Sequence, residues 1–487
     1  MTGNLRQSVR SAVIWRSGSQ ILAQTVAWAS TLAVIRILDP ADYGVFAMTQ
    51  VVLAFLSFLN GYGFASSLIQ ERDVDARKIR QGLGLLLLVN GAIALIQLGL
   101  APFAAAYYRQ PVVADLLRVQ ALIFLSTPFI ALPEALLVRE MDFRRPAIAN
   151  LVATVIMACV ALGCALGGLG VWTLVWAPLT AFWVRALMLV LLSRFFYLPS
   201  FRFKGAGRML NYGLLMLGSH FFWTIVTQSD VFVAGRSLSA HQLGLYAEAL
   251  FLTMIVATKF VPPLNEVAFP AYARIQDDLP MLSASFLKAA RIIMLVTVPL
   301  YFGLAAVAGP AVEVIFGPKW AGMAPLVTVL SLAMPAHTLH ILFAPALNAI
   351  GHPWINMRSS AAGAVVMPLA FLVGTQWGPI GLAWAWVIAF PVIPAFTFIQ
   401  AHRKLGVSAL QVLCAVAPGV TASAVMAVPV WMIGRGLTHL PAWSALAIQV
   451  ALGGFVYAAI LFLFSRKTLL ELVDLVVRRR APEAAPA

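Results

Sequence analysis

The stretch RILDPADYGVFA, from Arg36 to Ala47, decides the fold because it recurs later in the chain. Two hundred positions on, residues Arg236 to Ala247 read RSLSAHQLGLYA. Four of the twelve positions are identical, namely Arg36 with Arg236, Leu38 with Leu238, Gly44 with Gly244 and Ala47 with Ala247. Chance gives about one identity in such a pair, so we interpret the stretches as a repeat. Each copy lies between two long apolar segments, which predicts two copies of one membrane unit.

The composition defines the class of protein. Hydrophobic residues make up 61% of the chain and charged residues 10%, and the mean hydropathy is +0.90. A soluble domain carries about a quarter charged residues. Apolar runs of about twenty residues, the length that crosses a bilayer as a helix, recur throughout. The sequence therefore predicts an all-α polytopic membrane protein rather than a barrel, which would show alternating segments of about ten residues.

Neither the net charge nor the cysteines indicate another class. The charge is +15, but the basic residues lie in short loops between apolar segments, which argues against nucleic acid. The three cysteines, Cys159, Cys164 and Cys414, are scattered within apolar segments. This pattern predicts packing roles rather than a disulfide framework or a metal site.

About fourteen membrane spans are predicted. They fall near residues 11–37, 42–68, 81–107, 112–138, 147–167, 170–193, 209–235, 242–268, 283–309, 322–348, 355–376, 378–400, 407–434 and 440–465. The first span is too long for a cleaved signal peptide and carries polar residues, so we expect it to remain as a membrane helix.

The repeat divides these spans into lobes. Residues 1–200 form the predicted N-terminal lobe and residues 201–403 the C-terminal lobe, each with six helices. An even number of helices gives both copies the same orientation, so we expect a pseudo-two-fold axis along the membrane normal. Two appended helices follow in residues 404–465. Residues 466–487 are expected to form an amphipathic basic segment and a disordered tail.

The lysines and arginines predict the orientation. With alternating loops, 24 of them fall on the side of the N-terminus and 5 on the opposite side. Because this bias marks the cytoplasmic side, we expect both termini in the cytoplasm.

Two polar stripes occupy matching places in the repeat. Each has three polar residues spaced by four, which share one helix face: Arg16, Gln20 and Gln24 in the first copy and His220, Thr224 and Gln228 in the second. Such residues either line a wet cavity between the lobes or form hydrogen bonds between helices of one lobe. Their coincidence in both copies favours the cavity, where they would bind substrate.

Isolated charges within the spans supply further candidates. Lys259 lies deep in the eighth span, where it either holds an anionic substrate group or reaches the membrane surface or a distant carboxylate. Arg118, Arg185 and Asp230 are secondary candidates. We expect Arg236, like Arg36, to cap the end of its helix, because cations favour that position.

The second and eighth spans each contain helix-weakening residues. Gly61-Tyr62-Gly63 and Pro262-Pro263 fall at nearly the same repeat position. They predict either a hinge for alternating access or a static kink.

No motif of an enzyme is present in the sequence. Phosphate-cradling glycine loops, metalloprotease motifs and serine-hydrolase motifs are all missing, and no segment is suited to bind ATP. We predict a transporter without cofactor or metal, driven by an ion gradient, the membrane potential or consumption of its product.

Three motifs resemble those of a known family. They are RILDPADYGVFAM at 36–48, SSLIQERDVD at 66–75 and SDVFVAGRSLSAHQLGLYAEA at 229–249. With about fourteen spans, the chain resembles the oligosaccharide flippases of the multidrug/oligosaccharidyl-lipid/polysaccharide superfamily. It is most similar to the branch of colanic-acid and succinoglycan exporters.

The resemblance implies two six-helix lobes that open alternately. It implies transport of a polyprenyl-diphosphate-linked oligosaccharide across a bacterial inner membrane, for exopolysaccharide, O-antigen or capsule assembly. Membrane lipid, a polysaccharide polymerase and a glycosyltransferase are the expected partners. Our own inference, without a family motif behind it, is that Arg16 and Lys259 meet the diphosphate or acidic sugars.

Three alternatives remain open. They are a lipid II flippase, a multidrug:cation antiporter of the same superfamily and a membrane-embedded glycosyltransferase or polymerase. An antiporter usually has twelve spans and an acidic cavity, and a polymerase usually has a large external loop.

Overall fold

A computed structural model describes residues 2–57, 59–60, 75–201, 207–437 and 439–464. The side chains of residues 2–17, 207–220, 260 and 464 are not part of the description. Gly61 and Gly63 of the predicted hinge and the predicted segment 466–487 also lie outside the described residues. The chain forms two compact units, Met1–Ala247 and Glu248–Ala487.

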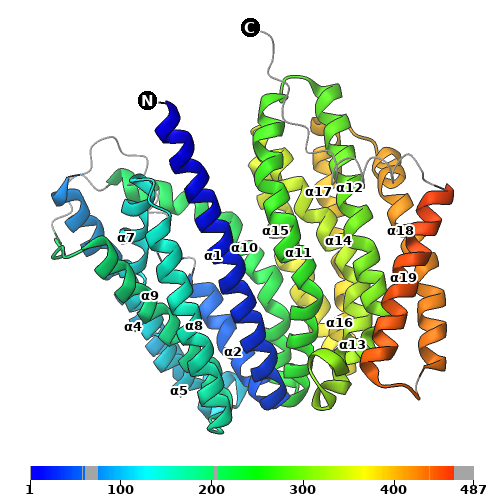
Figure 1. Ribbon diagram of the computed structural model, residues 1–487, viewed down its shortest axis with the longest axis horizontal. Helices are drawn as coiled ribbons and strands as arrows, with labels where there is room; N and C mark the ends of the chain where they lie inside the picture. The colour runs from blue at the N-terminus through cyan, green and yellow to red at the C-terminus, as the bar shows by residue number, and fades with distance from the viewer. Residues whose placement is uncertain (1, 58, 61–74, 202–206, 438, 465–487) are drawn as a thin grey trace. The chain divides into compact units, whose positions relative to one another are not determined.

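The first unit is built from helices throughout its described part (Figure 1). In chain order these are α1 (Thr2–Ile37), α2 (Pro40–Ser57), α4 (Ala76–Tyr108), α5 (Pro111–Gln120), α6 (Leu122–Ser126), α7 (Pro128–Arg139), α8 (Arg144–Leu166), the short 3-10 helix η1 (Gly170–Trp172), α9 (Thr173–Ser193), α10 (Gly207–Ser237) and the start of α11 (Ala240–Arg274). Helix α8 packs between α1 and α9, and α7 also packs against α9.

Local sequence explains where α4 begins and ends. The side chain of Asp75 accepts a hydrogen bond from the backbone N–H of Lys78, which caps the start of the helix. Arg109 ends it in the left-handed conformation with a φ of 56°. Pro111 then begins α5, because proline suits a first helical turn in which its missing N–H has no partner to bond.

The predicted span at 112–138 is a chain of three helices, α5, α6 and α7, rather than one regular helix. Pro128 explains the second break, since it has no N–H to donate to the carbonyl of Phe124. The N–H of Thr127 donates to that carbonyl instead, at 3.2 Å.

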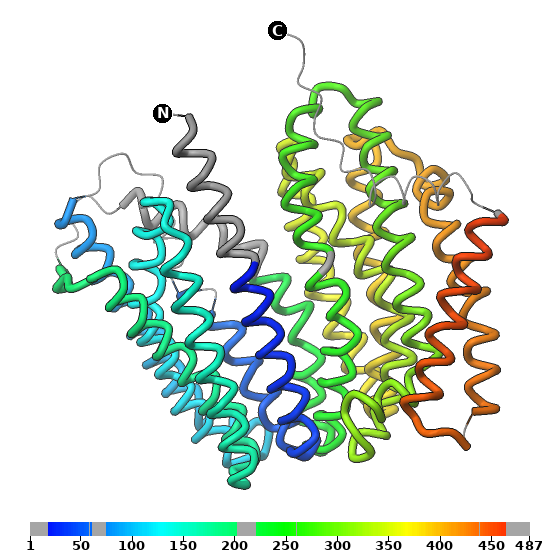
Figure 2. The backbone as a smooth tube through the Cα atoms, viewed as in Figure 1, coloured from blue at the N-terminus to red at the C-terminus, as the bar shows by residue number. Residues whose placement is uncertain are grey.

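The second unit continues from α11, and its path can be followed in Figure 2. Its further helices are α12 (Leu279–Ala306), α13 (Ala308–Ile315), η2 (Pro318–Met323), α14 (Ala324–Ala349), α15 (Pro353–Gly374), η3 (Thr375–Trp377), α16 (Gly378–Ala389), α17 (Val392–Leu405), α18 (Ala409–Gly436) and α19 (Ala442–Phe464).

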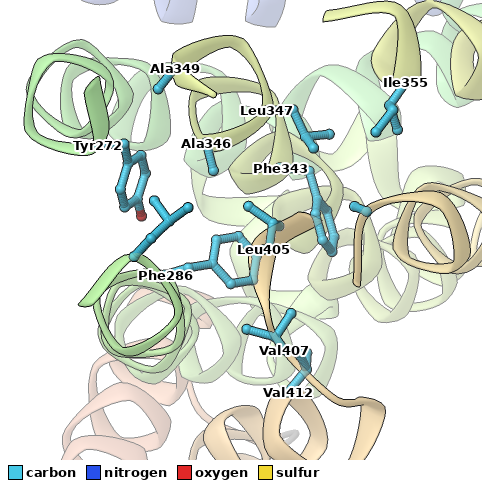
Figure 3. Close-up of a cluster of buried hydrophobic side chains, with 12 residues drawn as sticks. Tyr272, Phe286, Phe343, Ala346, Leu347, Ala349, Ile355, Leu405, Val407 and Val412 are labelled. Carbon is cyan, nitrogen blue, oxygen red and sulfur yellow. The ribbon is translucent and has the colours of Figure 1, made fainter. Parts of the chain in front are cut away.

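A buried apolar cluster joins α12, α14 and α17 in the second unit (Figure 3). The rings of Phe286 and Phe343 lie 5.3 Å apart between centroids, and Leu405 is fully buried beside them. Lipid tails are as apolar as these side chains, so the cluster stabilises the unit through close packing rather than through removal from water.

The predicted membrane class is confirmed. Eleven stretches among the described residues are long and apolar enough to cross a membrane. One of them, Pro353–Leu405, has 53 residues and contains the break at η3, so it provides two crossings. A single helix of that length would be about 80 Å long, against about 30 Å for the hydrocarbon core. With α2 and α10 in the second and seventh predicted spans, the fold is all-α and polytopic with about fourteen membrane helices.

The repeated glycines meet in the first unit. A Cβ atom on Gly44 would overlap the carbonyl oxygen of Ala240 and lie 2.9 Å from the nitrogen of Gly244. A Cβ atom on Gly244 would overlap the carbonyl oxygen of Pro40 and lie 2.9 Å from the nitrogen of Gly44. The contact is reciprocal at the 200-residue offset, and it requires glycine because the backbones of α2 and α11 touch there.

Candidate functional site

A polar pocket of about 420 Å³ lies in the first unit, among α1, α7, α8 and α9. The charged residues in its lining are Glu134 on α7 and Arg185 on α9. The uncharged polar residues in its lining are Ser19, Gln20 and Gln24 on α1 and Asn150 and Thr154 on α8. The remaining lining is largely apolar. Side-chain amides both donate and accept hydrogen bonds, so this wall suits a ligand rich in hydroxyl groups.

The two charged residues of the pocket form an ion pair. Nη2 of Arg185 donates to both carboxylate oxygens of Glu134, at 3.0 Å and 2.8 Å. Their side chains are 28% and 32% exposed. Within the described part of the chain, Nε of Arg185 is buried and has no hydrogen-bond partner. The pairing offsets the cost of two charges in membrane-spanning helices, and it leaves the guanidinium with a donor for a further acceptor.

Three of the predicted site residues come together in this pocket. Gln20 and Gln24 are exposed on α1 and share the pocket with Arg185. Arg16 and His220 lie in α1 and α10, but their side chains are outside the described residues.

The other predicted residues lie elsewhere. Arg118 pairs with Asp115 at 2.7 Å on an exposed face of α5. Thr224 is buried and Gln228 is half-buried on α10. Lys259 is exposed on α11. Helix α11 runs without interruption through Pro262 and Pro263, which are also exposed; the hinge stays a prediction.

Asp230 connects two helices of the first unit. It is fully buried on α10 and accepts a hydrogen bond at 2.8 Å from the hydroxyl of Tyr246, which is fully buried on α11. The guanidinium of Arg236, in the last turn of α10, lies 5.2 Å from the centre of the Tyr107 ring. Tyr107 in turn stacks on Phe232, with the ring centroids 4.7 Å apart. These contacts give Asp230 and Arg236 structural roles between helices.

Tyr246→Phe is expected to lower the stability of the protein. The change deletes the donor to Asp230 and leaves a buried carboxyl oxygen with one partner fewer, which costs about 1–3 kcal/mol. The measurement is the thermal melting of the purified protein. Tyr197→Phe is the control, because that side chain is partly exposed and packs on Phe195. Equal melting of the two variants would contradict the role given to Tyr246.

Three residues of the pocket were not predicted from the sequence, namely Glu134, Asn150 and Thr154. Asn150 and Thr154 are spaced by four, the pattern that selected Gln20 and Gln24, so the same rule applied to the fifth span would have found them. Glu134 is 51 positions from Arg185, and no local spacing connects the two. Its only signal was an acidic residue inside a predicted span.

The described residues contain no group of three or more histidine, cysteine or acidic side chains arranged to hold a metal ion. The three cysteines are free thiols.

Comparison with known proteins places the chain in a family. The model of a family described as "Polysaccharide biosynthesis protein" matches residues 33–325. The succinoglycan biosynthesis transport protein ExoT of Rhizobium meliloti is 28% identical over 463 residues, which cover 93% of this chain and 92% of that protein. The lipopolysaccharide biosynthesis protein WzxC of Escherichia coli is 24% identical, with 67% of each chain covered.

Solved structures show the same fold. A lipid II flippase, MurJ, in an inward closed conformation has a TM-score of 0.75 at 13% identity, covering 94% of this chain and 100% of that chain. An inward-facing multidrug resistance transporter of the MATE family has a TM-score of 0.60 at 14% identity, covering 79% of this chain and 98% of that chain. At these identities the likeness concerns the fold alone.

Proposed function

The chain belongs to the polysaccharide biosynthesis protein family, and from this premise we propose that it moves a polyprenyl-diphosphate-linked oligosaccharide from the cytoplasmic to the periplasmic leaflet of a bacterial inner membrane. The product would serve assembly of an exopolysaccharide, O-antigen or capsule. The names of ExoT and WzxC support the polysaccharide pathway, and that of ExoT supports transport. Movement would occur by alternating opening of the two predicted lobes.

The polar pocket is the observation that carries this proposal. A lipid-linked oligosaccharide has an anionic diphosphate next to sugars rich in hydroxyl groups. Arg185 supplies a guanidinium, whose planar donors suit phosphate oxygens. Gln20, Gln24 and Asn150 supply amides for the sugar hydroxyls.

The place of the pocket along its helices supports loading from the inner leaflet. Its lining includes Val138, at the end of α7, and Phe143, just before α8 begins. The charge bias of the sequence assigns this end of α7 and α8 to the cytoplasmic side. The pocket would then be open to a substrate that is made in the cytoplasm.

A lipid II flippase stays the second predicted function; the solved flippase shares the fold, which is also the fold of a multidrug transporter. A polymerase and a glycosyltransferase stay predicted partners of the transporter.

The test is the distribution of lipid-linked sugar in cells that lack this protein. We expect the intermediate to accumulate on the cytoplasmic leaflet and the wild-type protein to clear it. If nothing accumulates and the cells become sensitive to cationic drugs, the proposal fails and an antiporter is the better account.

Lys259→Ala, compared in the same cells, tests the second predicted cationic site. If Lys259 meets the diphosphate, the variant clears the intermediate more slowly than wild type, because an ionic hydrogen bond contributes about 1.5–3 kcal/mol. Lys288→Ala is the control, since Lys288 is an exposed lysine on α12. Clearance by Lys259→Ala at the wild-type rate, with equal expression, would remove Lys259 from the site.

A further inference from the structure

The ion pair of the pocket involves one nitrogen of the Arg185 guanidinium. Both oxygens of Glu134 accept from one nitrogen, Nη2 of Arg185. In the strongest geometry a carboxylate or phosphate accepts from two nitrogens, in two parallel hydrogen bonds. The buried Nε of Arg185 has no partner among the described residues. Because Nε is buried, an anion reaches it only when the guanidinium turns away from Glu134. An anion that then accepts from two nitrogens makes a better pair than Glu134 does.

Among the described side chains, Arg185 and Glu134 are also isolated from other charges. They are the only charged residues in the described lining. The other titratable residues on helices that pack against α7 lie at helix ends or are thiols: Arg77, Lys78, Arg80, Tyr107 and Tyr108 on α4, and Arg144, Arg145, Cys159 and Cys164 on α8. Arg145 forms an ion pair with Asp142, with 3.2 Å between Nε and Oδ2. Among the described side chains of the lining, one cation therefore stands between one resident carboxylate and any anion that enters.

We propose that Glu134 is an internal counterion, which occupies Arg185 in the empty pocket and is displaced when an anionic group of the substrate binds there. The identity of that group as a diphosphate rests on the proposed function. The resident carboxylate keeps the empty pocket electrically neutral, which matters because an unpaired charge in a membrane protein is costly. It also lowers the net affinity for the anion, which allows release on the other side of the membrane.

The direct test is binding of inorganic pyrophosphate to the purified full-length protein in detergent. Glu134→Gln keeps the shape of the side chain and removes the competitor, so we expect about tenfold tighter binding, which corresponds to about 1.4 kcal/mol. Arg185→Gln should lose the binding. Asp115→Asn is the matched control, because it makes the same charge change in the exposed pair with Arg118. We expect it to bind pyrophosphate within about twofold of wild type, since exposed pairs contribute little.

A second variant keeps the test decisive if Glu134→Gln folds poorly. Glu134→Asp retains the charge but shortens the side chain, and it should also tighten binding, by a smaller factor.

The outcomes separate this inference from the proposed function. If the variants of Glu134 bind pyrophosphate no more tightly than Asp115→Asn, or if Arg185→Gln binds as wild type does, the inference is overturned even where cells clear the lipid-linked sugar. If Glu134→Gln binds more tightly but cells lacking the protein accumulate no intermediate, the counterion role stands and the proposed function falls.

Discussion

Arg185→Ala is expected to abolish clearance of the lipid-linked oligosaccharide from the cytoplasmic leaflet. The change removes the cation of the pocket and leaves Glu134, its partner at 2.8 Å, as an uncompensated negative charge facing an anionic substrate. Loss of an ionic hydrogen bond of about 1.5–3 kcal/mol lowers affinity by roughly ten- to a hundredfold, and repulsion by Glu134 adds to this. The measurement is the leaflet distribution of the intermediate at matched expression.

Two variants distinguish lost binding from lost folding. Arg185→Ala combined with Glu134→Ala leaves the pocket neutral, so this protein should be produced and melt nearly as wild type while still failing to transport. Arg118→Ala removes an arginine from an exposed ion pair of the same unit and should transport normally. Normal clearance by Arg185→Ala would show that the pocket is not the substrate site.

Gly44→Ala and Gly244→Ala are each expected to remove most of the folded protein. In either variant the new methyl group overlaps a backbone carbonyl oxygen, of Ala240 or of Pro40, and a backbone atom cannot rotate away as a side chain does. Overpacking of a core commonly costs 1–3 kcal/mol, and a backbone overlap lies at or above the upper end of that range. The readouts are the yield of monodisperse protein and its melting temperature.

Gly91→Ala and Gly99→Ala are the controls for this prediction. Both glycines lie in the interior of α4, and a Cβ atom on either would have no neighbour within 4 Å. Alanine is favoured over glycine inside a helix by up to about 1 kcal/mol, so these variants should be neutral or stabilised. If Gly44→Ala and Gly244→Ala behave like the controls, the close contact between α2 and α11 is not needed for folding.

The sequence predicted the membrane class well because that class depends on composition and on the length of apolar runs. The sequence showed that Gly44 recurs as Gly244 at the 200-residue offset, but it did not show that the two glycines are in contact. The structure adds the reason for the identity, which is backbone contact between the two helices. Breaks inside predicted spans were missed at Thr127, because the prolines that cause them also occur inside continuous helices such as α11.

The pocket was predicted in part. Gln20 and Gln24 were found because a spacing of four places residues on one helix face. Arg185 was noticed only as an isolated charge, and Glu134 was not noticed at all. Their pairing depends on how α7 packs against α9, which is tertiary information that a single sequence does not carry. Arg118 was a candidate of the same kind, but Asp115 lies three positions before it, which is a helical neighbour spacing, and the two pair on the surface.

The central claim, that this chain itself transfers a lipid-linked oligosaccharide between leaflets, is tested most directly by reconstitution. Purified protein is placed in liposomes with a short polyprenyl-diphosphate-linked saccharide, and the fraction of saccharide open to a membrane-impermeant reagent is followed over time. The account predicts that wild-type protein raises this fraction well above the value in protein-free liposomes and that Arg185→Ala does not. An accessible fraction equal to that of protein-free liposomes, with correctly folded wild-type protein and an ion gradient or membrane potential supplied, would contradict it.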